Sequence, residues 1–192
     1  MPHRQTKRPT TIALAFATAF LLTPAFAHGS HVCWFDSGSH GTSGSNTFNG
    51  GSGKDVYSGL GGNDNIYGNQ GDDSLCGNTE DDTISGGAGI DLIRGDNNTD
   101  SIYGDNAQDL LEGGDGADTV RGNENGDSIY GGAGADTLEG GDADDDIYGD
   151  QGDDVLKGQN DYDWLVGNDG YDFCYGGPGL NDFGFCEYFQ QD

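Results

Sequence analysis

Basic residues are scarce in this chain of 192 residues, which has 7 Lys and Arg against 34 Asp and Glu. A chain this acidic repels nucleic acid and anionic membranes, so we expect neither as a partner and expect it to attract cations. Methionine occurs once and proline four times, whereas glycine occurs 37 times. Long hydrophobic runs are missing after residue 27, so we expect no membrane span in the remainder.

A single apolar run lies near the N-terminus. Arg4, Lys7 and Arg8 precede the run from Ile12 to Leu22, and the small-x-small triplet Ala25-Phe26-Ala27 follows it. This order predicts a secretory signal peptide over residues 1–27. Its removal leaves four basic residues against 34 acidic ones, a net charge of −30. We expect a secreted, extracellular protein, with the periplasm as the alternative destination.

The rest of the chain is a repeat. From Gly41 to Gly184 it divides into sixteen blocks of nine residues without insertion or deletion. Position 1 of each block is Gly and position 8 is apolar, while positions 2 and 4 are each Gly, Asn or Asp in thirteen blocks. Position 6 is Asn at Asn46 and Asn181 and Asp in the other fourteen blocks: Asp55, Asp64, Asp73, Asp82, Asp91, Asp100, Asp109, Asp118, Asp127, Asp136, Asp145, Asp154, Asp163 and Asp172.

Each block predicts a tight loop followed by a short strand. Gly, Asn and Asp accept a positive φ most readily, so positions 2 and 4 indicate a loop whose backbone carbonyls turn towards one point. Positions 7 to 9 are often Thr, Ser, Ile, Leu, Val or Tyr, which favour strands. Because side chains alternate along a strand, we expect position 8 to face inward and positions 7 and 9 to face outward.

These blocks resemble the nonapeptide repeat of RTX calcium-binding proteins, GGxGxDx(apolar)x, over 144 of the 192 residues. The resemblance implies an all-β fold, a right-handed parallel β-roll in which two blocks make one turn. It also implies that Ca²⁺ binds between loops n and n+2 and that the fourteen aspartates are its ligands, which gives twelve candidate sites. Calcium takes six to eight oxygen ligands in irregular geometry, whereas soft or nitrogen ligands for zinc or copper are absent from the loops.

Charged residues offer a separate indication of the two-block turn. Arg121, Glu139 and Lys157 follow one another at intervals of two blocks, and Arg94 and Glu112 have the same spacing. If loops n and n+2 stack, opposite charges lie side by side on the outer faces. A turn of one block would instead place Glu112 beside Arg121, so this spacing alone leaves both arrangements open.

The energetics predict that the metal-free chain is largely unfolded and that calcium folds it. One inward apolar side chain per block is a small core, and the acidic chain repels itself. The sites should also differ. Position 4 holds Glu80, Ala107 and Ala143 in three blocks, and we expect weaker or empty sites near these residues.

Cysteines and aromatic residues mark both ends of the repeat. Four cysteines in a secreted chain favour two disulfides, and we predict Cys174 with Cys186 and Cys33 with Cys76, with free thiols as the alternative. We expect caps over residues 28–40 and 185–192, because solenoids need their open ends covered.

Motifs of common catalytic sites are missing. Gly-x-Ser-x-Gly, His-Glu-x-x-His, a Walker loop and Cys-x-x-Cys do not occur, and we predict that the protein is not an enzyme. Three functions remain: a calcium-binding extracellular protein with a structural or sensing role, an adhesion or ice-binding module that uses an outer face, and a module that assists an enzyme or toxin. The sequence identifies no protein or glycan partner.

Overall fold

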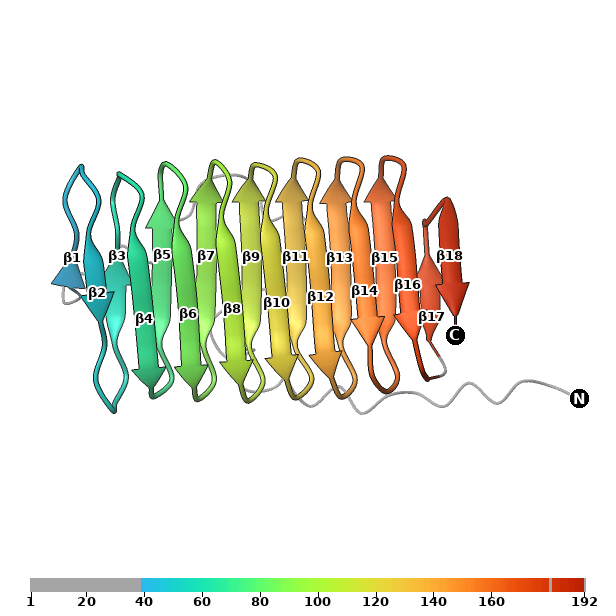
Figure 1. The fold of residues 1–192 in the computed structure, drawn as a ribbon, viewed down its shortest axis with the longest axis horizontal. Coiled ribbons are helices and arrows are strands. Elements are labelled where there is room, and N and C mark those ends of the chain that lie inside the picture. Colours follow the sequence, from blue (N-terminus) through green and yellow to red (C-terminus); the bar gives the residue numbers. More distant parts are fainter. Residues whose placement is uncertain (1–38, 180, 192) are drawn as a thin grey trace, which may run out of the picture. The chain divides into compact units, whose positions relative to one another are not determined.

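The computed structural model describes residues 39–179 and 181–191, which form strands and loops. The predicted signal peptide, Cys33 and most of the predicted N-terminal cap lie outside these residues. Within them, no helix has the length and hydropathy needed to cross a membrane. The strands form two nine-stranded parallel sheets, one of odd-numbered and one of even-numbered strands (Figure 1).

We call these sheet A and sheet B. Sheet A contains β1 (Ser39–His40), β3 (Val56–Ser58), β5 (Ser74–Asn78), β7 (Leu92–Asn97), β9 (Leu110–Asp115), β11 (Ser128–Ala133), β13 (Asp146–Gln151), β15 (Trp164–Asp169) and β17 (Asp182–Gly184). Sheet B contains β2 (Thr47–Asn49), β4 (Asn65–Gln70), β6 (Thr83–Ala88), β8 (Ser101–Asn106), β10 (Thr119–Glu124), β12 (Thr137–Asp142), β14 (Val155–Gln159), β16 (Phe173–Gly177) and β18 (Tyr188–Gln191).

The register confirms the turn of two blocks. Val120 in β10 pairs with Leu138 in β12, which pairs with Leu156 in β14, so each step to the neighbouring strand advances the chain by two blocks. Consecutive strands such as β10 and β11 therefore belong to opposite sheets, and the loops that join them lie alternately along the two long edges of the roll (Figure 1). The architecture is a parallel β-roll, as the repeat predicts.

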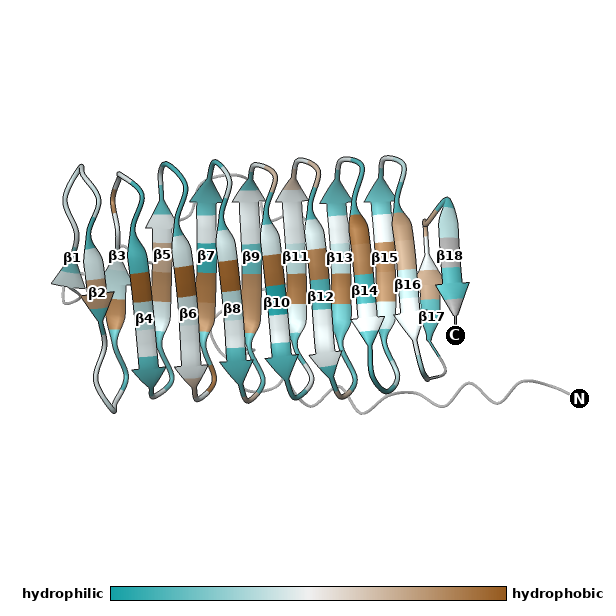
Figure 2. Cartoon of the chain, viewed as in Figure 1, coloured by the Kyte–Doolittle hydropathy of each residue, from teal (hydrophilic) through white to brown (hydrophobic). Residues whose placement is uncertain are grey.

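The interior consists of the position-8 row, as expected. Figure 2 shows this row as a hydrophobic band across the middle of the strands, between hydrophilic loops. Each such side chain contributes about 1.5–3 kcal/mol through burial. Tyr57 and Cys174 are 4% and 1% exposed, and Phe48 and Phe183 pack against the two ends. Twelve members of the row are fully buried: Ile66, Leu75, Ile84, Ile93, Ile102, Leu111, Val120, Ile129, Leu138, Ile147, Leu156 and Leu165.

The outer faces carry the predicted charge pairs. On sheet B, Glu139 accepts hydrogen bonds from Arg121 Nε at 2.8 Å and from Lys157 Nζ at 2.7 Å. On sheet A, Arg94 donates to Glu112 at 3.0 Å. These contacts join residues that are two blocks apart, so they exclude the turn of one block. Such half-exposed pairs contribute about 0.2–1 kcal/mol each.

Both sheets extend beyond the sixteen blocks. The strand β1 lies within residues 28–40 and β18 lies within residues 185–192, the two segments expected to cap the roll. The predicted disulfide between Cys174 and Cys186 is present and ties β16 to the segment before β18. The predicted partner of Cys76, Cys33, is outside the described residues, and that pairing stays a prediction.

Candidate calcium-binding loops

The loop backbone has the conformation that the residue types predict. From the third block to the sixteenth, every residue at positions 2 and 4 has a positive φ. Glu80, Ala107 and Ala143, which depart from the Gly, Asn and Asp pattern, have φ values of 67°, 86° and 80°. The loops at these three blocks therefore keep the same backbone path, although a side chain with a Cβ is strained there.

The aspartates at position 6 form two columns, each at the start of one sheet's strands. Column A consists of Asp55, Asp73, Asp91, Asp109, Asp127, Asp145 and Asp163, which precede strands of sheet A. Column B consists of Asp64, Asp82, Asp100, Asp118, Asp136, Asp154 and Asp172, which precede strands of sheet B. Apart from the half-buried Asp55, these aspartates are at most 3% exposed.

One carboxylate oxygen of each aspartate after Asp55 holds the loops in register. The Oδ1 of Asp136 accepts a hydrogen bond from the backbone N–H of Asp118 at 2.8 Å, and the Oδ1 of Asp154 accepts from Asp136 at the same distance. The same bond recurs down both columns at 2.6 to 3.1 Å. Each aspartate from Asp64 to Asp172 therefore ties its own loop to the loop one turn earlier.

The other carboxylate oxygen, Oδ2, is buried and has no hydrogen-bond partner among the described residues in twelve of these aspartates. They are Asp64, Asp73, Asp82, Asp91, Asp100, Asp109, Asp118, Asp127, Asp136, Asp145, Asp154 and Asp172. A buried charged oxygen that lacks a partner costs several kcal/mol. Asp55 differs, because its Oδ2 accepts from the Gly51 N–H at 2.6 Å.

Glycine at position 1 keeps space free beside this oxygen. A Cβ added at Gly113 would lie 2.5 Å from Asp118 Oδ2 and 2.5 Å from the carbonyl oxygen of Gly131, one turn further on. A side chain there would collide with both atoms. The position-1 glycine therefore leaves the aspartate oxygen of loop n facing the glycine carbonyl of loop n+2.

Burial within a column of like charges disfavours the ionised carboxylates. Burial raises the pKa of Asp109 to about 9, and the charges of Asp127 and Asp91 add to this, although the hydrogen bond from the Asp91 N–H lowers it. Burial likewise raises the pKa of Asp145 to about 9 and that of Asp100 to about 8. The columns thus need positive charge or protons to be stable.

The available donors fit calcium. Among the described residues, no three His, Cys, Asp or Glu side chains gather at one point, so zinc-type clusters are not formed there. Each interval between stacked loops instead offers a carboxylate oxygen and a backbone carbonyl oxygen, which are hard ligands. Calcium accepts such mixed oxygen sets and completes its shell with water, whereas magnesium requires stricter octahedral geometry.

The column ends hold different residues. Asn46 lies at the start of column B and Asn181 at the end of column A, where its Oδ1 accepts from the Asp163 N–H at 2.7 Å. At the end of column B, the acceptor for the Asp172 N–H is Glu187 Oε2 at 2.8 Å. Sequence reasoning missed Glu187, because it lies after the last block and is out of phase with the repeat.

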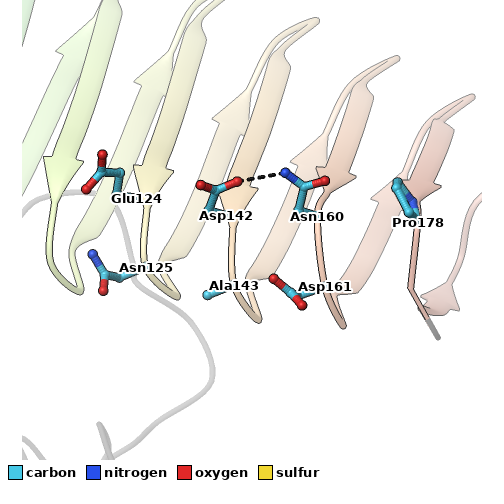
Figure 3. A pocket seen from close by; sticks show the side chains of 7 residues that line it. All are labelled: Glu124, Asn125, Asp142, Ala143, Asn160, Asp161 and Pro178. Carbon is cyan, nitrogen blue, oxygen red and sulfur yellow. Dashed lines mark hydrogen bonds between the residues drawn. The ribbon is translucent and has the colours of Figure 1, made fainter.

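A groove of about 730 Å³ runs along the outside of the loops. Its lining residues occupy positions 3 and 4 of four alternate blocks, which stack on one another: Glu124, Asn125, Asp142, Ala143, Asn160, Asp161 and Pro178 (Figure 3). Asp142 accepts from Asn160 Nδ2 at 2.7 Å. Glu124, Asp142 and Asp161 are exposed, so water solvates their carboxylates, in contrast to those of the columns.

Parallel strands joined by stacked loops of glycine and buried aspartate define a class of calcium-binding solenoids. The family model of the RTX calcium-binding nonapeptide repeat matches seven overlapping segments, 40–75, 49–84, 77–111, 95–129, 112–147, 121–156 and 148–182. The chain therefore belongs to the RTX calcium-binding repeat family, which implies Ca²⁺ as its ion. A comparison with individual curated proteins gives no match.

Proposed function

We propose that this chain is a secreted calcium-binding protein with a structural or sensing role, which Ca²⁺ folds after export. The fourteen position-6 aspartates are its ligands, and each of the twelve intervals between two stacked loops that both carry such an aspartate is one site. The observation that carries this proposal is the set of buried carboxylate oxygens without partners in both columns. Calcium bound beside these oxygens removes both the desolvation cost and the repulsion along each column.

Export fits this coupling of metal binding to folding. A chain with few inward side chains and a net charge of −30 after removal of residues 1–27 has little tendency to collapse by itself. Binding free energy then becomes folding free energy, because the unfolded chain has no preformed site. A low-calcium compartment keeps the chain unfolded, and a calcium-rich exterior folds it.

The test is a calcium titration of the purified protein, with calorimetry for binding and circular dichroism for strand content. We expect little β structure in excess chelator and a cooperative gain of β structure as calcium rises, with binding over the same range. Full β structure in chelator contradicts calcium-driven folding, and an absence of binding at millimolar calcium contradicts the function itself. Magnesium at equal concentration is the control and should fold the chain poorly.

A second candidate is an adhesion or ice-binding module. Thr83, Ser101, Thr119 and Thr137 stack in register along the outer face of sheet B and form a hydroxyl row. The adjacent position-9 row contains Tyr103, Arg121 and Glu139, which is unlike the flat hydroxyl surface that ice would match. Thermal hysteresis of the calcium-loaded protein separates the candidates, and its presence favours the second.

A further inference from the structure

The segment after the last block continues the roll with a shortened loop. Phe185 follows Gly167 by two blocks and thus takes the place of a position-1 glycine. Tyr188 then pairs with Phe173, which precedes it by less than two blocks, so this loop is shorter than those of the repeat. Glu187 directly precedes Tyr188, as each position-6 aspartate directly precedes its strand. The shortened loop therefore brings Glu187 to the place of an aspartate in column B.

The contacts around Asp172 match those of an interior loop. Glu187 Oε2 accepts from the Asp172 N–H at 2.8 Å, as Asp136 Oδ1 accepts from Asp118. The Tyr188 N–H donates to the Asp172 carbonyl at 3.1 Å, as the Phe173 N–H donates to that of Asp154 at 2.8 Å. The interval between loops thus has the usual hydrogen bonds although its second loop lies outside the repeat.

The ligand atoms of an interior interval are also present. A Cβ added at Gly167 would collide with Asp172 Oδ2 and with the carbonyl oxygen of Phe185, the pair of atom types found beside Gly113. Asp172 is fully buried, and its Oδ2 has no hydrogen-bond partner among residues 39–179 and 181–191. The glutamate side chain is longer than that of aspartate, which compensates for the shorter loop. Cys186, which directly precedes Glu187, is anchored to Cys174 by the disulfide.

We propose that Asp172 and Glu187 form a thirteenth calcium site, which closes column B at its C-terminal end. This inference rests on the proposed function, since it assumes that calcium fills the intervals between stacked loops. The start of column B and the end of column A differ in charge, because Asn46 and Asn181 supply neutral amides there. The Asp172–Glu187 site has two carboxylates, as the interior sites do, but Glu187 is exposed, so water completes the ion's shell and the ion exchanges readily.

Native mass spectrometry at stepwise calcium concentrations tests this site by counting bound ions. Glu187→Gln keeps an oxygen that can accept from the Asp172 N–H but removes the charge, and we expect it to bind one ion fewer than the unaltered protein. Glu187→Lys places a fixed positive charge beside Asp172, so it should also lose one ion while the roll stays folded. The exposed Glu124→Gln, outside both columns, is the matched control and should keep the full number.

The outcomes separate this inference from the proposed function. If the unaltered protein folds with calcium and both Glu187 variants bind the same number of ions over the same range, the terminal site is wrong and the function stands. If the unaltered protein binds no calcium, the proposed function fails, and this inference fails with it. Loss of one ion in both Glu187 variants but not in Glu124→Gln supports the site.

Discussion

Acid should partly replace calcium in folding this chain. Burial raises the pKa of nine column aspartates to about 6 or above, against about 3.9 in an unfolded chain. Since these pKa values are raised by folding, the metal-free roll binds more protons than the unfolded chain. The stability that these carboxyls contribute to the metal-free roll is then fully present below about pH 4. It is lost as pH rises through the folded pKa values of about 6 to 9.

The expected effect is large. Each such carboxyl changes the free energy of unfolding by about 1.4 kcal/mol per pH unit between its unfolded and folded pKa values. Two of them already give about 3 kcal/mol per pH unit, a large part of the 5–15 kcal/mol that stabilises a typical domain. Circular dichroism of metal-stripped protein should therefore show β structure increasing as pH is lowered from 7.5 to 4.5, with sedimentation to confirm that the chain stays monomeric.

Two kinds of variant sharpen the assay. Asp109→Asn and Asp145→Asn imitate protonated carboxyls, so they should move the acid-folding midpoint to higher pH. The exposed Asp161→Asn lies outside the columns and should leave the midpoint unchanged. Metal-stripped protein that gains no β structure on acidification, or an equal shift in all three variants, would refute the argument. In the calcium-loaded protein the sign reverses, because protons compete with calcium for the same oxygens.

Three further substitutions test the loops. Gly113→Ala places a Cβ against Asp118 Oδ2 and the Gly131 carbonyl. It should lower the free energy of unfolding by about 1–3 kcal/mol and raise the calcium concentration at the folding midpoint. Gly44→Ala is the control and should change neither, because open space surrounds a Cβ at that position. Ala107→Gly removes the strain of a φ of 86°, so thermal unfolding should show the calcium-loaded roll stabilised by about 1 kcal/mol. Ala117 does not have a positive φ, so Ala117→Gly should lower the stability instead. Asp136→Ala should weaken calcium-driven folding more than Asp82→Ala, because the Asp82 loop contains Glu80 at position 4; equal calcium midpoints would show that the strain at Glu80 does not matter.

The repeat period predicts most of the fold. Fixed phasing of glycine, aspartate and an apolar residue specifies the loops, the buried row and the two-block turn, and Glu139 lies between Arg121 and Lys157 as their two-block spacing predicts. The period places residues but not individual atoms. It therefore does not reveal that one carboxylate oxygen bonds the previous loop while the other remains available, a division that depends on how stacked loops sit against one another.

The irregular positions show where sequence reasoning stops. Ala107 departs from the pattern, yet it has the positive φ of Gly89 and Asn125, the residues stacked before and after it. Neighbouring turns thus impose the loop conformation on a residue that does not favour it. Glu187 is the opposite case: it breaks the period, and only the pairing of Tyr188 with Phe173 reveals that a shortened loop returns a carboxylate to column B.

The division of oxygens within each aspartate has a consequence for the whole array. An interior residue such as Asp118 accepts from the Asp100 N–H through Oδ1 and faces the Gly131 carbonyl through Oδ2, so it contributes to the intervals on both sides. An ion bound in one interval, as proposed, would order a loop that also forms the next interval, so we expect neighbouring sites to bind calcium cooperatively. Loss of an interior aspartate damages two intervals, whereas loss of Glu187 at the end of column B damages one. Cooperativity of this kind requires unbroken phasing, and the sixteen blocks follow one another without a single insertion or deletion.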